Sequence, residues 1–299
     1  MSQPHSIVIT GASRGLGLAS ATHMYRLGWH VVAAMRAPES GLAALRSKTG
    51  AAVDDPRLIA IPLDLTDTAS IAAAAKAIVA AVGAPHVLVH NAGISAAGML
   101  EETPIDLWEL MFATHIFGPV SLTKALLPSM RTAGRGRIVV ISSQGGVRGM
   151  PEIAAYSAAK GALERWAESL AGEVAPFGLG VTVLVAGTFD TDIITDAGTA
   201  DHRDLRGPYA ALHATVDRRG RFAMRFARPP AHFARALAKA ADERAPFARH
   251  AVGLDARMLV VANRLLSSKA LHRVTRLAMG TPPPGALRNA SATESDTHG

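Results

Sequence analysis

The sequence predicts a doubly wound parallel α/β sheet of about seven strands with helices on both faces. Short apolar runs recur along the first two-thirds of the 299-residue chain, and segments with helical spacing of apolar residues lie between them. Strands that are apolar throughout are typical of parallel sheets covered on both faces. Right-handed crossovers then place helices on each face. The first six strands are expected at Ile7–Ile9, Val31–Ala34, Leu58–Leu63, Val87–Val89, Arg137–Ile141 and Val181–Val185.

The helices between these strands are bounded by turn residues. The expected helices are one that ends near Leu27, Thr68–Val82, Leu107–Met130 and Tyr156–Ala175. Proline lacks an amide proton and disrupts the turn that precedes it, so we expect the third helix to break near Pro119 and to close at Pro128. Pro176 and Gly178 are expected to end the fourth helix.

The C-terminal third has a weaker pattern. Residues 190–230 show little periodicity, and we expect short helices there that form a substrate-binding or lid segment. A helix is expected at Ala231–Ala241, and the seventh strand at about Arg249–Val252.

Beyond that strand, Leu254–Met279 carries apolar residues at helical spacing with Arg and Lys between them, which predicts a basic amphipathic helix. Packing against the main domain is the favoured role, and docking to an anionic membrane surface stays open. One domain is expected over residues 1–280, and a disordered tail over residues 281–299.

Composition excludes several classes of site. The chain has no cysteine, so disulfides, zinc–thiolate sites and thiol catalysis are excluded, and no metal site is expected. Hydrophobic residues make up 49% of the chain and charged residues 18%, which is enough to bury a sizeable core. No apolar run reaches the roughly 18 residues of a membrane span. The N-terminus shows no secretory pattern, so a cytoplasmic location is expected.

The charge is unevenly distributed. The net charge is −2 up to Ala200 and +9 from Asp201 onward. An anionic cofactor, an acidic substrate or a membrane surface would suit the basic part, and a solvated Arg-rich surface is the plain alternative. Aromatic residues make up only 5% of the chain and no nucleic-acid motif is present, so no nucleic-acid partner is expected.

A glycine-rich turn follows the first strand directly and opens a helix. Glycines let the backbone approach a phosphate closely, and the N–H groups at the helix N-terminus then point at the anion. The strand–turn–helix context predicts a dinucleotide site. The expected cofactor contacts in this turn are Thr10, Gly11, Ser13, Arg14, Gly15, Leu16 and Gly17.

The end of the second strand indicates which dinucleotide binds. An acidic residue there would bind the ribose 2′-hydroxyl of NAD, but this chain has Met35 and Arg36. A guanidinium binds two phosphate oxygens together, so Arg36, assisted by Arg14, is expected to pair with the 2′-phosphate of NADP(H).

Four motifs together, the glycine-rich turn among them, make the chain resemble the short-chain dehydrogenase/reductase family. Thr10–Gly17 matches TGxxxGxG, Asn91–Gly93 matches the NAG segment after the fourth strand, and Tyr156–Lys160 matches YxxxK. Ser143 lies 13 residues before Tyr156, as the family requires. The resemblance implies a single-domain, Rossmann-like oxidoreductase.

This resemblance covers about residues 5–192 well and continues more weakly beyond them. The segment His250–Ala256 and the basic helix after it resemble hydroxysteroid- and retinol-dehydrogenase-like members. A homo-oligomer is expected from the resemblance, because family members often pair through helices that begin near Asp106 and Tyr156.

The chemistry of the YxxxK pair also follows from the residues. Tyr156 and Lys160 share one helix face at i and i+4. An ammonium about 5 Å from the phenol favours the phenolate by about 3 kcal/mol at an effective dielectric of about 20, which lowers the pKa of Tyr156 by about two. Tyr156 is then the general acid for carbonyl reduction or the base for alcohol oxidation. Ser143 is expected to hydrogen-bond the substrate oxygen.

The resemblance implies further cofactor contacts. Lys160 is expected to hold the nicotinamide ribose as well as to act on Tyr156. The family usually has Pro before the Gly that follows the sixth strand, whereas this chain has Ala186 before Gly187. The remaining contacts implied by the family's motifs are Asp64, Leu65, Asn91, Ala92, Gly93, Gly187, Thr188 and Thr191.

One residue departs from the family's catalytic pattern. His115 stands where relatives have an Asn that holds a water linking the Lys to solvent. Histidine also binds water and relays protons, so retained activity with a changed pH profile is expected. An impaired relay and a purely packing role are the alternatives.

The residues expected to line the substrate pocket predict a lipophilic substrate. Large apolar residues are the candidate walls of the pocket, namely Val147, Met150, Phe189, Ile193, Ile194, Tyr209, Phe222 and Met224. The expected function is NADP(H)-dependent interconversion of a carbonyl and a secondary alcohol on a steroid-, retinoid- or polycyclic-like molecule. The alternatives are an NADP(H)-binding regulatory protein with little catalysis and a membrane- or nucleic-acid-binding module.

Overall fold

The computed structural model describes residues 5–191 and 199–288, and its central feature is a parallel sheet of seven strands. The strands run in the order β3-β2-β1-β4-β6-β7-β9, and every neighbouring pair is parallel. The predicted fold class is therefore confirmed. The strands are β1 Ser6–Thr10, β2 His30–Met35, β3 Leu58–Pro62, β4 Val87–His90, β6 Gly136–Ser143, β7 Leu179–Ala186 and β9 Phe247–Val252.

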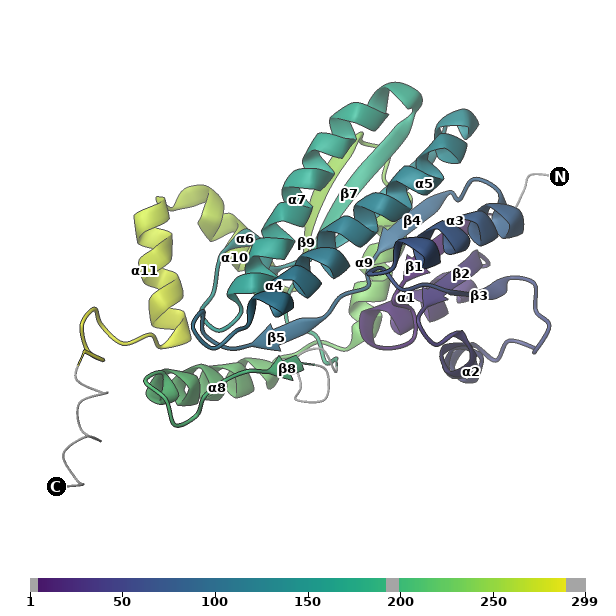
Figure 1. Ribbon diagram of the computed structural model, residues 1–299. Helices are drawn as coiled ribbons and strands as arrows, with labels where there is room; N and C mark the ends of the chain where they lie inside the picture. Colours follow the sequence, from purple (N-terminus) through teal and green to yellow (C-terminus); the bar gives the residue numbers. More distant parts are fainter. Residues whose placement is uncertain (1–4, 192–198, 289–299) are drawn as a thin grey trace.

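Helices cover both faces of this sheet (Figure 1). Alternate residues of a strand point to opposite faces, so Val8 faces α3, α5 and α7 while Ile7 and Ile9 face α1, α2 and α9. Each face has its own hydrophobic core. The helices are α1 Gly15–Arg26, α2 Pro38–Thr49, α3 Thr68–Val82, α4 Ile105–Phe112, α5 Gly118–Ala133, α6 Gln144–Val147, α7 Ala154–Val174, α8 Ala210–Met224, α9 Pro230–Ala241, α10 Leu254–Leu265 and α11 Ser268–Met279.

The prediction that Pro128 closes the central helix is wrong. Helix α5 continues through Pro128 to Ala133. Pro128 lies on the exposed side of α5, while Leu122, Leu126 and Met130 on the other side are fully buried against the sheet. Burial of that apolar side stabilises the helix more than one missing hydrogen bond weakens it.

The interruption expected near Pro119 lies earlier in the chain. The backbone forms a π-helical turn over Ala113–Phe117, between α4 and α5. Pro119 stands in the first turn of α5, where its missing amide proton has no intrahelical partner in any case.

Three other expectations of secondary structure are corrected. Helix α2 and the two short paired strands β5 Ser95–Ala97 and β8 Thr199–Asp201 were not predicted. In the described part of residues 190–230, the 15-residue helix α8 stands where several short helices were expected. The expected helix Leu254–Met279 is two helices, because the Ser267 side chain caps the N-terminus of α11 by accepting from the amide of Ala270 at 3.3 Å.

The ends of the described chain add little regular structure. Residues 281–288 contain no helix or strand, and residues 289–299 of the expected tail lie outside the described residues. The single domain expected over residues 1–280 stays a prediction.

One helical run in the described part of the chain is long and apolar enough to cross a membrane. It comprises α4, the π-turn and α5, from Ile105 to Ala133, with a mean hydropathy of 1.3. Leu122, Leu126 and Met130 within it are fully buried in the core. The packing of α5 against the sheet therefore accounts for its apolar character.

Substitution of Gly178 tests whether the turn that leads into β7 requires glycine. The φ of Gly178 is +77°, and a Cβ atom there would lie 2.5 Å from the carbonyl oxygen of Gly134. We expect Gly178→Ala to lower the free energy of unfolding by about 1–3 kcal/mol, measured by urea denaturation. Gly172→Ala is the matched control, because no atom lies within 4 Å of the added methyl in helix α7. It should leave stability unchanged or raise it by up to about 1 kcal/mol.

Candidate active site

A large cavity of about 1500 Å³ lies at the carboxyl ends of the strands. The chain leaves β1 and β4 toward opposite sides of the sheet, and the crevice at such a switch point is where open α/β sheets bind ligands. Helices α8, α10 and α11 stand at the same edge, apart from the sheet (Figure 1).

The predicted glycine turn forms one end of this cavity. A Cβ atom on Gly11 would lie 2.7 Å from the Cα of Ala92, and one on Gly17 would lie 2.2 Å from the carbonyl oxygen of Gly11. Gly11 and Gly15 have positive φ values of +67° and +53°. Only glycine fits these close approaches. Within the described residues no side chain caps the N-terminus of α1, so its N–H groups are available to a pyrophosphate.

Thr10 and Asn91 hold this turn against β4. The Asn91 side-chain amide donates to the carbonyl oxygens of Thr10 and Gly11 at 2.9 and 3.2 Å. The Thr10 hydroxyl donates to Val89 and accepts from the amides of Asn91 and Ala92. Thr10 is fully buried, so its side chain supports the turn from beneath. A direct cofactor contact of Thr10 stays a prediction.

The other predicted cofactor residues surround the same cavity. Arg36 is exposed beyond the end of β2, near enough to Asp64 to affect its titration. Hydrogen bonds from Thr66 lower the pKa of Asp64, and the charge of Arg36 lowers it further. The predicted residues that line the cavity are Gly11, Ser13, Arg14, Gly15, Leu16, Gly17, Arg36, Asp64, Leu65, Asn91, Ala92, Gly93, Gly187, Thr188 and Thr191. A dinucleotide therefore fits the residues present, since the turn leaves room that any larger side chain would fill.

Ser143, Tyr156 and Lys160 meet in the middle of the cavity lining. Ser143 is the last residue of β6, while Tyr156 and Lys160 lie in the first two turns of α7. The Lys160 ammonium donates to the carbonyl of Ile141 at 2.8 Å and lies 5.7 Å from the centre of the Tyr156 ring. Burial lowers the pKa of Lys160 to about 8, and Glu164 partly opposes this.

The protein's own groups raise the pKa of Tyr156, whereas the sequence analysis expected a lowered pKa. Burial raises the pKa of the Tyr156 hydroxyl, and a hydrogen bond with Ser143 offsets part of that rise. Lys160 is itself buried, and its ammonium donates to the carbonyl of Ile141. A protonated phenol at neutral pH is the form that acts as a general acid.

His115 lies in the π-turn, with its ring edge-on to Tyr156 at 5.5 Å between centroids. Its Nε2 lies 2.9 Å from the carbonyl oxygen of Ile94, and its buried Nδ1 has no hydrogen-bond partner among the described residues. Burial and the charge of Lys160 lower its pKa to about 3. The ring is therefore neutral at pH 7, and any proton relay through it uses the neutral imidazole. Its catalytic role stays a prediction.

Asp255 is a site residue that the sequence did not single out. Its carboxylate accepts from the amide of Thr188 at 2.6 Å and from the Gln144 side chain at 2.7 Å. A Cβ atom on Gly187 would lie 2.1 Å from the same carboxylate. Asp255 thus fixes the loop after β7 where relatives usually have a proline before the glycine. The match of His250–Ala256 to related enzymes was the available signal.

The substrate walls differ partly from the prediction. Met150, Phe189 and Met224 line the cavity, whereas Val147 packs into the core and Phe222 is exposed. Tyr209 packs against the cluster of Met99, Leu212 and Val216, and the predicted residues Ile193 and Ile194 lie outside the described residues. Further apolar walls, at residues that the sequence did not single out, come from α8, α10 and α11. They include Val216, Met258, Leu259, Leu271, Val274 and Met279.

A buried histidine of helix α8 lies between two carboxylates from other parts of the chain and holds the helix beside the cavity. His213 Nδ1 lies 2.6 Å from Glu152, and its Nε2 lies 2.8 Å from Glu102. Both ring nitrogens can donate only when the ring is an imidazolium. Burial lowers the pKa of His213, but its hydrogen bonds to Glu102 and Glu152 raise it by more, so the pKa lies above 6.5.

Comparison with known proteins identifies a family and several relatives. The family model for short chain dehydrogenase matches residues 5–201. Dehydrogenase/reductase SDR family member 7B of Xenopus laevis is 37% identical over 201 residues, which cover 65% of this chain and 61% of that protein. The 3-ketodihydrosphingosine reductase of Bacteroides thetaiotaomicron is 36% identical over 203 residues, 68% of each chain. A crystal structure of a short-chain dehydrogenase from Streptomyces avermitilis has a TM-score of 0.78 and 34% identity, covering 94% of this chain and 100% of that one.

His213 predicts how stability varies with pH. A folded-state pKa above the ordinary 6.5 contributes stability in full below pH 6.5, and this stability is lost as pH rises through the folded pKa. We expect the free energy of unfolding to fall between pH 6.5 and 9, and this fall to be absent in His213→Gln. Urea denaturation at four pH values measures it, with the exposed His232→Gln as control. An identical pH dependence in wild type and His213→Gln would refute the assignment.

Proposed function

The chain belongs to the short-chain dehydrogenase family, and on that premise we propose that it is an NADP(H)-dependent enzyme that interconverts a carbonyl and a secondary alcohol on a lipophilic small molecule. The observation that carries this proposal is that Tyr156, Ser143 and Lys160 line the same cavity as the glycine turn. A proton donor thus lies beside the place where a dinucleotide fits. The sequence match spans 61% of the Xenopus relative, so activity and substrate are proposed for this chain on its own residues.

The preference for NADP(H) rests on Arg36 and Arg14. Both guanidiniums are exposed at the cavity end that the glycine turn forms. No carboxylate follows β2 directly, where an NAD enzyme would place one for the ribose hydroxyls. A 2′-phosphate beside Arg36 would gain charge-assisted hydrogen bonds.

Proton transfer is assigned to Tyr156 in the proposed mechanism. NADPH, when bound, supplies the hydride for the carbonyl carbon. The Tyr156 hydroxyl donates its proton to the carbonyl oxygen, and the hydroxyl of Ser143 donates a hydrogen bond to the same oxygen. The Lys160 ammonium stabilises the phenolate that remains, because a charge in a buried site is weakly screened. In the reverse direction the phenolate takes the proton of the alcohol.

A lipophilic substrate is supported by the outer part of the cavity. Its walls are formed by apolar side chains of α8, α10 and α11, including Val216, Met258 and Val274. Burial of apolar surface there favours a molecule with a large apolar body. One relative is named as a 3-ketodihydrosphingosine reductase, which supports reduction of a ketone.

Assembly and location are proposed from the sequence alone. We propose a homo-oligomer that pairs through helices beginning near Asp106 and Tyr156, in the cytoplasm. Contact of the basic helices α10 and α11 with an anionic membrane surface stays open as a second role for that segment.

Replacement of the proton donor should separate catalysis from cofactor binding. Tyr156→Phe is expected to lower turnover of a panel of lipophilic ketones by about 10²–10⁴-fold, because general acid catalysis is lost. NADPH binding, followed by the fluorescence of the reduced cofactor, should remain. Tyr209→Phe is the matched control, since Tyr209 lies outside the cavity lining. Tight NADPH binding without turnover in wild type would instead favour the regulatory role.

Arg36 should determine cofactor preference. We expect wild type to bind NADPH more tightly than NADH. Arg36→Ala should weaken NADPH binding by about 10–100-fold, since a charge-assisted hydrogen bond contributes about 1.5–3 kcal/mol. NADH binding should change little. Arg36→Lys should recover only part of the loss, because an ammonium lacks the forked donors. Equal losses for both cofactors in Arg36→Ala would contradict 2′-phosphate recognition.

A further inference from the structure

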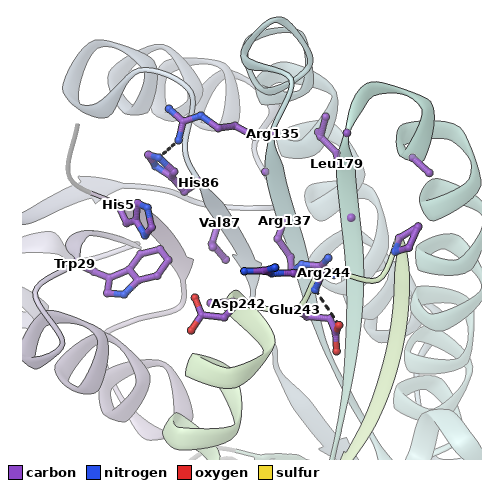
Figure 2. Close-up of a pocket in the computed structure, with 16 residues that line it drawn as sticks. His5, Trp29, His86, Val87, Arg135, Arg137, Leu179, Asp242, Glu243 and Arg244 are labelled. Carbon is purple, nitrogen blue, oxygen red and sulfur yellow. Dashed lines mark hydrogen bonds between the residues drawn. The ribbon is translucent and has the colours of Figure 1, made fainter. Parts of the chain in front are cut away.

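A second cavity of about 380 Å³ lies at the opposite edge of the sheet (Figure 2). Its lining comes from the amino ends of the strands and from the loop between α9 and β9, and it shares no residue with the large cavity. None of the proposed catalytic or cofactor residues lies here. A ligand of this cavity would therefore be distinct from the substrate and the cofactor.

The inner wall of this cavity contains a buried cation, Arg137, at the start of β6. Its side chain packs over Gly180, where a Cβ atom would lie 2.3 Å from Nη2. Nη1 donates to the hydroxyl of Thr182 and Nη2 to the carbonyl of Ala245, each at 2.8 Å. Both acceptors are neutral. Arg137 is only 6% exposed.

Arg137 therefore lacks a direct counter-ion. No carboxylate of the described residues lies within 4.0 Å of its guanidinium, and Glu243 acts on it only at longer range. A buried charge without a paired opposite charge is costly, so an anion in the cavity would stabilise this site. Five N–H donors are present on a guanidinium, and the two neutral acceptors leave others available.

The charges around the cavity indicate the charge of that anion. Arg135, Arg137 and Arg244 line it together with Asp242 and Glu243, which leaves one positive charge in excess. The Glu243 carboxylate is already engaged by the backbone amides of Arg244 and Ala245, at 2.9 and 3.1 Å. Burial lowers the pKa of His86 to about 4, so His86 adds no charge at pH 7. A monoanion balances this set.

One wall of the cavity is a row of flat rings. The ring of His5 lies between Trp29, at 5.1 Å between centroids, and His86, at 4.8 Å. Figure 2 shows the three rings side by side, with Arg137 and Arg244 across the cavity from Trp29 and Arg135 beside His86. Such a wall favours a planar aromatic body, and the volume falls within the range of small-molecule sites.

We propose that this cavity binds a small aromatic monocarboxylate. Its carboxylate pairs with Arg137 at the inner wall and with Arg244 at the mouth, and its ring lies along Trp29, His5 and His86. The proposal does not depend on the proposed function of the large cavity.

Calorimetric titration of the full chain with sodium benzoate tests this site. At constant ionic strength we expect one saturable site, with neutral benzamide binding at least tenfold more weakly because it lacks the charge. Acetate should also bind more weakly, since it has no ring. Heat that does not saturate, or equal affinity for benzoate and benzamide, would overturn the proposal.

Variants locate the binding. Arg137→Met should reduce benzoate affinity at least tenfold. Arg244→Gln, at the exposed mouth, should reduce it several-fold, and it carries the test if Arg137→Met fails to fold. Arg131→Gln is the control, because this exposed arginine of α5 lies outside the lining. Unchanged affinity in Arg244→Gln and in a folded Arg137→Met would place benzoate elsewhere and refute the site.

Saturation with NADPH distinguishes the two cavities. Benzoate should bind equally well with and without NADPH if it occupies the cavity at the amino ends of the strands. Competition between the two ligands would mean that benzoate had entered the large cavity, and the proposal would fail.

Discussion

The tight contact between the segments that follow β1 and β4, at the centre of the sheet, is the constraint on which the rest of the structure depends. Gly11 approaches Ala92 so closely that a methyl group would not fit, and the Asn91 amide joins the two chain segments through the carbonyls of Thr10 and Gly11. Because β1 and β4 lead away in opposite directions at this point, the contact also fixes the floor of the crevice. The position of the glycine turn relative to the groups on β6 and α7 follows from it.

Helix α7 is attached to the sheet on two sides, and this attachment sets the electrostatics of the site. Lys160 is bound to Ile141 of β6, while Glu164, one turn later, accepts from Ser142 and pairs with Arg249 of β9 at 2.7 Å. Buried hydrogen bonds of this kind hold the helix in one register. Burial then acts on each titratable group in turn. It lowers the pKa of Lys160 to about 8 and of His115 to about 3, and it raises that of Tyr156.

Local patterns were sufficient to predict the sheet and the cavity's polar groups, and long-range contacts were not visible in them. Thr68–Val82 agrees to the residue because Asp67 caps its start and Gly83 follows its end. Arg249–Val252 lies within β9, which begins two residues earlier at Phe247. Asp255 and the Glu102–His213–Glu152 cluster were not predicted, because the residues that form these hydrogen bonds lie 61 to 111 positions apart along the chain. The predicted helix end at Pro128 was wrong for a different reason. The burial of one side of α5 determines the length of the helix, whereas the prediction from proline took only the backbone into account.

Many of the apolar walls of the large cavity are supplied by a part of the chain that the family model does not cover. The match ends at residue 201, whereas α8, α10 and α11 lie after it. Under the proposed function, the groups that touch the reacting atoms are thus encoded before residue 201, and many of the groups that touch the body of the substrate are encoded after it. Selection on substrate choice can alter the second stretch freely while the first stays constant. Two descendants of one ancestor can therefore keep the same proton donor and diverge in what they act upon, through changes confined to the last third of the sequence.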